Sequence, residues 1–196
     1  MLDKIVFGLS WFRSPKKVGT ITPSGKKLGA AIAREVDIAK PGLVVELGAG
    51  TGALTEGLLN AGLPPERLIA IESDPALAKH LRKRFPQVTV VEGDATDLKT
   101  TLKDFDLSGL HTIVSGLPPL LMERADQERL FTQALELMGP DGRIAQYTYS
   151  PKSPIPPAYL HSWGFEGRRR AFVLANFPPA SVWLFTPLKK SEAMAA

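Results

Sequence analysis

The sequence has no cysteine and only three histidines among its 196 residues. Without cysteine, the chain cannot form disulfides, thiolate metal centres or a cysteine nucleophile. The histidines are far apart and lack the spacing of metal ligands, so we expect no metal site. No apolar run approaches the ~18 residues of a membrane-spanning helix. The N-terminal apolar stretch also lacks the small-residue cleavage site of a signal peptide. These absences predict a cytoplasmic protein.

Hydrophobic residues make up 44% of the chain and charged residues 22%, which is the balance of one soluble globular domain. The net charge of +4 is unevenly distributed. Residues 1–36 carry seven basic and two acidic residues, and residues 167–196 carry five basic residues and one acidic residue. The segment between them carries 12 basic and 17 acidic residues. An acidic body with basic ends indicates an anionic partner, such as nucleic acid or a membrane surface, that is reached through the ends.

The N-terminal residues 2–12 are apolar on more than one side of a helix. At ~100° per residue most of them share one face, whereas Phe7 and Trp11 lie near the opposite face. Cationic residues follow directly, and this combination is typical of a helix that lies at a membrane surface. The alternative is an ordinary helix that packs on the domain. The candidate membrane-contacting residues are Trp11, Phe12, Arg13, Lys16 and Lys17.

Strand and helix signals alternate along the rest of the chain. A helix is expected to begin at Thr22 and Pro23, with Thr22 as its N-cap, and to run to Val36. The periodicity then predicts strands at 43–47, 68–72, 88–91, 112–115, 142–147, 171–174 and 182–185, and helices at 53–60, 75–84, 124–138 and 159–163.

This alternation predicts the α/β class. We expect a Rossmann-like, doubly wound, mostly parallel seven-stranded sheet preceded by N-terminal helices. The short last connection makes the C-terminal strand antiparallel, because parallel neighbours need a long crossover. The expected organisation is an N-terminal membrane-binding or lid segment over 1–37, a domain over 38–188 and a tail over 189–196.

The first strand–helix unit carries a glycine-rich turn, VVELGAGTG at residues 44–52. Glycines at alternate positions let the backbone approach a ligand closely. The spacing differs from the GxGxxG of dinucleotide-binding proteins, and the absence of GK[ST] excludes a P-loop. Glu46 stands before the first glycine, where a carboxylate suits a cationic or hydrogen-bond-donating ligand better than a pyrophosphate. Its position inside an apolar strand argues against an ordinary surface charge.

Two more acidic residues end neighbouring strands. Glu72 follows the glycine turn by about 20 residues, which is where a carboxylate reaches ribose hydroxyls. Asp94 and Ala95 follow the third predicted strand, where an adenine amino group could be held.

Together, "VELGAGTG", the strand-end Glu72 and "EGDA" resemble the class I S-adenosylmethionine-dependent methyltransferases over about residues 40–150. The resemblance implies that Glu46 and the glycine turn surround the amino-acid part of the cofactor. It further implies that Glu72 binds the ribose and Asp94 the adenine. The full set of expected cofactor-binding residues is Glu46, Gly48, Ala49, Gly50, Thr51, Gly52, Glu72, Ser73, Asp94, Ala95, Ser115 and Gly116.

The segment after the fourth predicted strand bears on the substrate. Methyltransferases that act on adenine usually have Asn or Asp here, then Pro-Pro or Leu-Pro, then an aromatic residue that stacks on the base. This chain has Ser115 and Leu120 instead, which lack the amide and the ring. Methylation of a flipped adenine is therefore disfavoured.

The flanking segments resemble the bacterial phospholipid N-methyltransferases. The similar stretches are "FRSPKKVGTITPSG" (12–25), "VSGLPPLL" (114–121), "QYTYSPKSPIP" (146–156) and "NFPPASVWLF" (176–185). The resemblance implies stepwise N-methylation of phosphatidylethanolamine toward phosphatidylcholine. The enzyme would be peripheral on the inner face of the cell membrane, with a phospholipid substrate, an anionic membrane surface as partner and no nucleic acid.

The expected chemistry is attack of a neutral amine on the sulfonium methyl group. Tyr147 and Tyr149, at the end of the fifth predicted strand, are the catalytic candidates. They could relay a proton or contact the methylammonium by cation–π interaction, and the alternative is that they only fill the cleft wall. Arg168 is a candidate for the lipid phosphate together with Lys16 and Lys17, and its alternative is a solvated strand edge.

Three other functions compete with this interpretation. An adenine N6-dimethyltransferase of ribosomal RNA would explain the basic ends and has a similar fold. A binding module without catalysis would not need the cofactor motifs. A methyltransferase for small soluble amines would leave the N-terminal segment unexplained.

Overall fold

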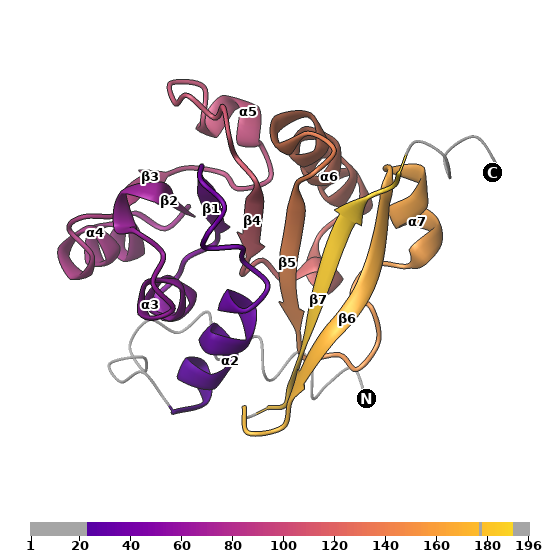
Figure 1. Ribbon diagram of the computed structural model, residues 1–196, viewed down its shortest axis with the longest axis horizontal. Coiled ribbons are helices and arrows are strands. Elements are labelled where there is room, and N and C mark those ends of the chain that lie inside the picture. The colour runs from indigo at the N-terminus through magenta and orange to yellow at the C-terminus, as the bar shows by residue number, and fades with distance from the viewer. Residues whose placement is uncertain (1–22, 177, 190–196) are drawn as a thin grey trace.

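The strands of the computed structural model form one seven-stranded sheet (Figure 1), and the structure describes residues 23–176 and 178–189. The strand order is β3-β2-β1-β4-β5-β7-β6. Strands β1 to β5 are parallel to one another, and β7 is antiparallel to both β5 and β6. This confirms the predicted doubly wound sheet with an antiparallel C-terminal strand. The strands are β1 (Val44–Leu47), β2 (Leu68–Glu72), β3 (Thr89–Glu92), β4 (Thr112–Ser115), β5 (Arg143–Thr148), β6 (Phe165–Val173) and β7 (Ala180–Pro187).

Helices cover both faces of the sheet, as Figure 1 shows. Buried side chains of α2, α3 and α4 pack on one face, and those of α5, α6 and α7 pack on the other. Hydrophobic residues of each strand alternate between these two cores, so both faces of the sheet are buried. The helices are α2 (Pro23–Ala33), α3 (Ala53–Asn60), α4 (Pro75–Arg84), α5 (Leu98–Thr101), α6 (Arg124–Met138) and α7 (Pro157–Ser162), with 3₁₀ turns η2 (Pro65–Arg67) and η3 (Pro119–Leu121).

Helix α2 crosses α3 at a pair of glycines. A Cβ atom on Gly57 would lie 2.6 Å from the carbonyl carbon of Gly29, so neither position has room for a side chain. Leu28 and Ile32 of α2 are buried in the same core. The predicted start of this helix at Pro23 agrees with the structure, but it ends at Ala33, and the predicted N-cap Thr22 lies outside the described residues.

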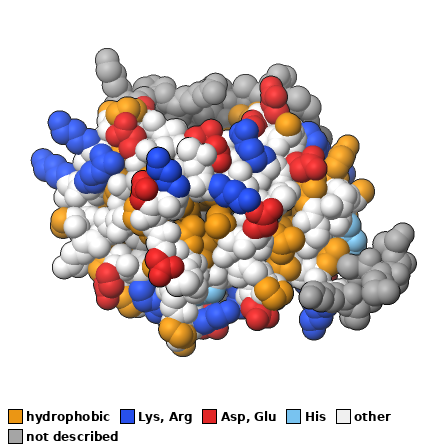
Figure 2. All heavy atoms as spheres, turned by 90° about the horizontal axis from the view of Figure 1, so that it is seen from above, with side chains coloured by type: hydrophobic (Ala, Val, Ile, Leu, Met, Phe, Trp, Pro, Cys, Tyr) orange, Lys and Arg blue, Asp and Glu red, His pale blue; other side chains and the backbone are white. Residues whose placement is uncertain are grey.

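The carboxyl ends of β4, β5 and β6 point the same way, toward the bottom of Figure 1, where the β6–β7 hairpin projects. Figure 2 looks at the opposite edge, where acidic and basic side chains are interspersed and hydrophobic side chains show between them. None of the described helices is long and apolar enough to cross a membrane. The predicted membrane-contacting residues Trp11, Phe12, Arg13, Lys16 and Lys17 lie outside the described part of the chain.

Candidate active site

The glycine turn after β1 has a left-handed backbone at each of its three glycines. The φ angles are 66° at Gly48, 58° at Gly50 and 85° at Gly52. A Cβ on Gly52 would lie 2.4 Å from the Phe85 ring, so the turn is packed against the end of α4. A Cβ on Gly50 would meet nothing closer than 4.0 Å, so the turn is open at this residue. The backbone of Gly50 is therefore accessible to a ligand.

The turns after β1 and β4 touch each other. A Cβ on Gly116 would lie 2.7 Å from the Gly48 carbonyl oxygen, and the Gly116 N–H donates to the carbonyl of Leu47 at 2.8 Å. The connections from β1 lead to β2 on one side and from β4 to β5 on the other, so the strand order reverses here. Open α/β sheets bind their ligands at the carboxyl ends of strands at such a reversal.

Glu72 at the end of β2 is held against the glycine turn. Its Oε2 accepts a hydrogen bond from the Gly50 N–H at 2.7 Å, and its Oε1 accepts one from the Asp74 N–H at 2.9 Å. The side chain is only 7% exposed, whereas the neighbouring Ser73 is exposed. Each carboxylate oxygen has a further lone pair. Glu72 can therefore accept hydrogen bonds from vicinal hydroxyls next to Gly50, which fits the predicted ribose contact.

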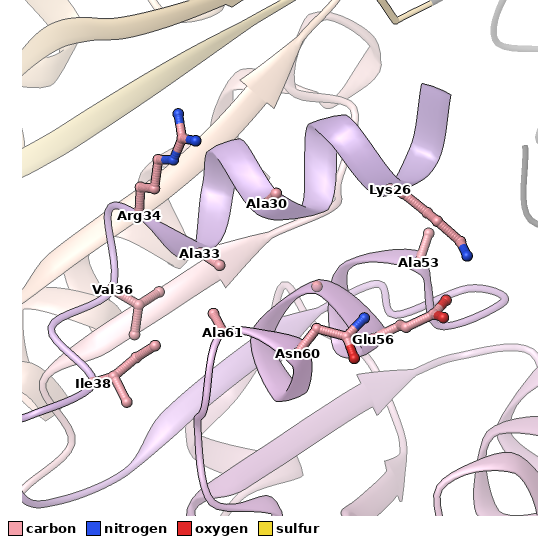
Figure 3. A pocket seen from close by; sticks show the side chains of 11 residues that line it. Lys26, Ala30, Ala33, Arg34, Val36, Ile38, Ala53, Glu56, Asn60 and Ala61 are labelled. Carbon is pink, nitrogen blue, oxygen red and sulfur yellow. The ribbon is translucent and has the colours of Figure 1, made fainter. Parts of the chain in front are cut away.

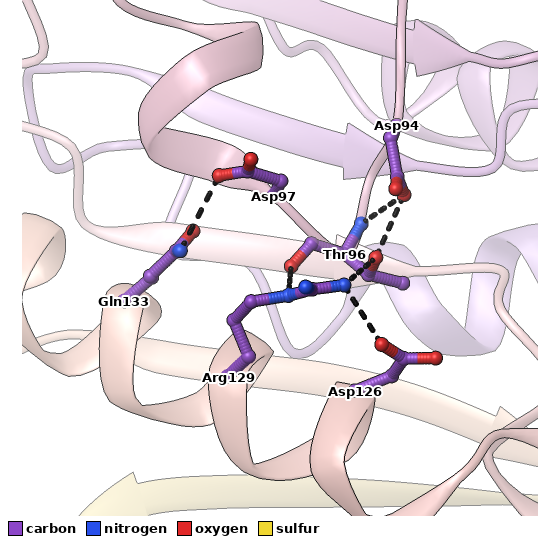
Figure 4. A network of polar contacts seen from close by, with 6 residues as sticks. All are labelled: Asp94, Thr96, Asp97, Asp126, Arg129 and Gln133. Carbon is purple, nitrogen blue, oxygen red and sulfur yellow. Dashed lines mark hydrogen bonds and ion pairs between the residues drawn. The ribbon is translucent and has the colours of Figure 1, made fainter.

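Asp94 after β3 is oriented by helix α6 through a polar network (Figure 4). Its Oδ1 accepts from the N–H and the hydroxyl of Thr96 at 2.7 and 2.8 Å. Arg129 donates to the Thr96 carbonyl at 3.1 Å and to its hydroxyl at 2.9 Å, and pairs with Asp126 at 2.7 Å. Asp94 is exposed, and its Oδ2 has no partner among the described residues. That oxygen is a free acceptor for a ligand amino group, while the adjoining Ala95 is buried.

Glu46 is fully buried beneath the glycine turn. Its two oxygens accept from the N–H of Thr55 at 3.2 Å and from the Thr55 hydroxyl at 2.7 Å. Burial raises the pKa of Glu46 to about 7, the bonds from Thr55 oppose this, and the nearby Glu72 charge adds to it. Glu46 is therefore not a surface charge. It is a carboxyl group whose ionisation is poised near neutrality.

Gln146 shapes the turn after β4, a role that the sequence analysis missed. Its Nε2 lies 3.2, 3.0 and 2.7 Å from the carbonyl oxygens of Ser115, Leu117 and Tyr147. Ser115 is 1% exposed, and its hydroxyl accepts from the Leu117 N–H at 3.3 Å. A polar amide inside an apolar strand was the signal in the sequence, because a buried amide needs partners.

Tyr147 and Tyr149 lie together on the face of the sheet that α2 and α3 cover. Tyr147 lies within β5, and its ring centroid is 5.7 Å from that of Tyr149, in an edge-on arrangement. Burial raises the pKa of Tyr147 to about 12, and it also raises the pKa of Tyr149. Both hydroxyls therefore stay protonated at neutral pH. Neither is therefore a phenolate base at neutral pH.

Arg168 lies on the edge strand β6, which β7 and β5 separate from β4. Its guanidinium is exposed and pairs with Glu166 at 3.2 Å. The structure therefore does not bring Arg168 to the glycine turn. The predicted strand at 171–174 begins at Phe165 instead, because an edge strand tolerates a run of charged residues on its solvent side.

A groove of about 430 Å³ lies between α2 and α3 (Figure 3). Its floor is apolar, with Ala30, Ala33 and Ala61, and Lys26 and Arg34 lie at its rim. None of the predicted cofactor-binding residues lines it, so the groove is separate from the glycine turn. Among the described residues there is no group of three or more His, Asp or Glu side chains that could hold a metal ion.

Comparison with known proteins gives three kinds of similarity. Residues 44–142 match a family model described as a methyltransferase domain. The chain is 30% identical to the ornithine lipid N-methyltransferase of Singulisphaera acidiphila, over 97% of this chain and 100% of that protein. It is 30% identical to the ribosomal RNA small subunit methyltransferase A of Chlorobaculum parvum, but over 70% of this chain and 50% of that protein.

Solved structures share the fold. The crystal structure of the glycopeptide N-methyltransferase MtfA complexed with S-adenosylmethionine has a TM-score of 0.64 to this chain. The sequence identity is 18%, and the match covers 87% of this chain and 100% of that chain. The sheet and its helices are thus common to both proteins.

Proposed function

This chain belongs to the methyltransferase-domain family, and from that premise we propose that it transfers a methyl group from S-adenosylmethionine to the amine of a membrane lipid. The observation that carries the proposal is the end-to-end similarity to a lipid N-methyltransferase, compared with similarity to only half of a ribosomal RNA methyltransferase. Phosphatidylethanolamine and its mono- and dimethyl derivatives are the proposed substrates. Ornithine lipid, named for the relative, is the second candidate.

The residues around the glycine turn support S-adenosylmethionine as the cofactor. S-adenosylmethionine supplies an electrophilic methyl group on a sulfonium centre. Glu72 offers carboxylate oxygens for the ribose hydroxyls, and Asp94 offers Oδ2 for the adenine amino group. The open backbone at Gly50 admits the ligand between them. These groups bind and orient the reactant, which is the main requirement of a methyl transfer.

The residues beside β4 and β5 support an alkyl amine as acceptor. Ser115 is buried and bonded to its own turn, and Leu120 is 45% exposed, so this part of the site offers neither an amide nor a ring to an adenine. Tyr147 and Tyr149 are protonated phenols that can face a methylammonium through their rings. The amine must lose its proton before it attacks. Because each phenol already carries a proton, it can accept the amine's proton only while it releases its own to solvent water.

The test is parallel incubation with S-adenosylmethionine labelled in the methyl group. The acceptors are phosphatidylethanolamine vesicles, ornithine lipid vesicles and ribosomal RNA. We expect label in the organic phase with phosphatidylethanolamine. Label in ribosomal RNA and none in lipid would overturn the proposal, and label in ornithine lipid alone would move the substrate to that lipid.

Replacement of Glu72 by alanine should weaken S-adenosylmethionine binding by about 1–3 kcal/mol, because buried ribose hydroxyls would lose their charged acceptor. The matched control is Glu92→Ala. Glu92 ends β3 in register with Glu72 but is exposed and pairs with Arg82. Calorimetric titration should show unchanged affinity for Glu92→Ala. An unchanged affinity for Glu72→Ala would remove Glu72 from the ribose role.

The proposed peripheral attachment to the inner face of the membrane depends first on the N-terminal segment. Deletion of residues 2–12, or the combination of Trp11→Ala with Lys16→Ala and Lys17→Ala, should abolish vesicle binding but leave the domain folded. Attachment of the full chain should weaken as salt rises, because screening acts over roughly 8–10 Å. Co-sedimentation with neutral and anionic vesicles measures this, with circular dichroism as the folding control. Undiminished binding after deletion would make the segment an ordinary packing helix.

A further inference from the structure

Four of the six exposed large hydrophobic side chains among the described residues lie at the end of the sheet where the parallel strands have their carboxyl termini, and the other two are Phe105 and Tyr159. Leu120 and Leu121, in η3 after β4, are 45% and 54% exposed. Phe172, near the end of β6, is 47% exposed, and Leu174, in the β6–β7 hairpin, is 73% exposed. We call these four residues the edge patch. All four lie at or just after the carboxyl ends of strands, as does the proposed cofactor site at the glycine turn.

Phe172 and η3 are on the same face of the sheet. Ala171 and Val173 pack with the α2 and α3 core, so Phe172 between them points to the opposite face, which α6 covers. η3 is bonded to α6, because the Gln127 side chain donates to the carbonyl of Pro119 at 2.7 Å. In Figure 1 the hairpin projects beyond the ends of β4 and β5 at this edge.

Packing of the domain does not account for the exposure of these side chains. Pro119, next to Leu120, is buried, so the chain at η3 contacts the core and turns its two leucines outward. Leu174 stands in a hairpin connection, where turn formation requires no large apolar residue. Leucine left in water forgoes the free energy of burial, and large apolar side chains exposed at one end of a molecule are typical of an interaction surface.

The charges at this edge indicate what the partner is. Lys152, after β5, and Arg169, on β6, are exposed, and neither has a carboxylate partner among the described residues. Arg169 donates to the carbonyl of Pro151 at 3.2 Å, so the two cations lie on neighbouring segments. The exposed acidic residues Asp74 and Asp94 follow β2 and β3, at the other end of the sheet. The hairpin side of this end is therefore apolar and basic, whereas the exposed Glu123 follows η3.

We propose that the edge patch inserts into the interface of an anionic phospholipid bilayer and so holds the proposed cofactor site at the glycine turn against the lipid headgroups. The inference rests on the proposed lipid substrate and adds a second contact to the one expected from the N-terminal segment. Leucine and phenylalanine side chains enter the boundary between headgroups and acyl chains, and nearby cations attract the anionic surface. A headgroup amine then lies on the side of the molecule where the cofactor binds.

The first test uses a double variant that carries both Leu121→Ser and Leu174→Ser. The control variant is Phe105→Ser. Phe105 is 36% exposed and precedes β4, so it lies at the opposite end of the sheet, where the parallel strands begin. On vesicles of phosphatidylethanolamine and phosphatidylglycerol, we expect the double variant to bind about a hundredfold more weakly, or about tenfold for each leucine. The control should bind within about twofold of the wild-type chain. S-adenosylmethionine binding and methylation of a monomeric short-chain phosphatidylethanolamine should persist in the double variant.

A second measurement does not depend on the stability of that variant. The chain has no cysteine, so Leu174→Cys and Phe105→Cys each introduce a unique site for an environment-sensitive fluorophore. Anionic vesicles should shift the emission of the label at position 174 to the blue and leave the label at 105 unchanged.

The possible outcomes distinguish failure of the edge-patch proposal from failure of the proposed function. Vesicle binding by the double variant equal to that of the wild-type chain, or no shift at position 174, would overturn the edge patch. A change from dimer to monomer in the variant would assign the patch to a second copy of the chain and overturn it too. If the wild-type chain methylates no lipid at all, the proposed function fails, and this result is independent of vesicle binding.

Discussion

Replacement of Gly52 by alanine is expected to lower the free energy of unfolding by about 2–4 kcal/mol and S-adenosylmethionine affinity by at least about tenfold. Two causes combine. The φ of 85° at Gly52 is one that L-residues rarely adopt, and the added Cβ would lie 2.4 Å from the Phe85 ring and 3.0 Å from Leu81. Relief of this clash moves either α4 or the glycine turn, whose Gly50 N–H is bonded to Glu72. Chemical denaturation and calorimetric titration measure the two effects.

Gly62→Ala is the matched control for backbone strain. Gly62 has a φ of 99°, but a Cβ there would meet no heavy atom within 4 Å. We expect it to cost about 1–2 kcal/mol and to leave cofactor affinity unchanged. Combining Gly52→Ala with Phe85→Ala should recover part of the loss, which a double-mutant cycle reports as coupling. Equal losses for Gly52→Ala and Gly62→Ala, without coupling to Phe85, would show that the contact with α4 does not constrain the turn.

Much of the fold could be predicted because short-range signals mark its element boundaries. Helices 53–60, 75–84 and 124–138 and strands 68–72 and 112–115 begin and end at the predicted residues. Glycine, proline and capping residues flank them, such as Asp74, whose side chain accepts from the first turn of α4. Periodicity failed at β6, where Arg168, Arg169 and Arg170 interrupt the apolar alternation. Pairing with β7 along the edge of the sheet decides this strand, and that pairing is not local in sequence.

The candidate site was predictable in its backbone and less so in its side-chain partners. The glycine turn and the strand-end carboxylates follow from position in the α/β pattern, and the structure places Glu72 against Gly50 as that pattern suggests. The partners of Glu46 and Asp94 come from elsewhere in the fold. Thr55 on α3 holds Glu46, and Arg129 on α6 fixes the turn that carries Asp94. Sequence spacing does not reveal such contacts, because they depend on how helices pack over the sheet.

Replacement of Glu46 by glutamine is expected to stabilise the cofactor-free protein at alkaline pH. The pKa of Glu46 is about 7 in the folded chain, compared with 4.5 as its ordinary value. The folded state therefore binds this proton more tightly than the unfolded state does. Stability falls as pH rises from about 4.5 to about 7, by about 3 kcal/mol in total. Glutamine does not ionise and can still bond to Thr55, so the variant should lack this loss.

Urea denaturation at pH 5 and pH 8 measures the difference. The variant should match the wild-type chain at pH 5 and exceed its free energy of unfolding by up to about 3 kcal/mol at pH 8. Glu92→Gln, at an exposed carboxylate, should change neither value by more than about 0.5 kcal/mol. An equal pH dependence in wild-type and Glu46→Gln chains would mean that Glu46 is ionised in the folded state without cost.

Glu46→Gln should weaken cofactor binding, although it stabilises the cofactor-free protein. We propose that the buried carboxylate is retained because it compensates the ammonium of S-adenosylmethionine. Glu46→Gln should then bind the cofactor at least about tenfold more weakly at pH 8, although its apo form is more stable. Binding to the wild-type chain near pH 6 should release a proton as Glu46 ionises, and titration in buffers of different ionisation enthalpy detects that proton. If the variant releases the same proton and binds equally well, Glu46 serves only to join β1 to α3 through Thr55.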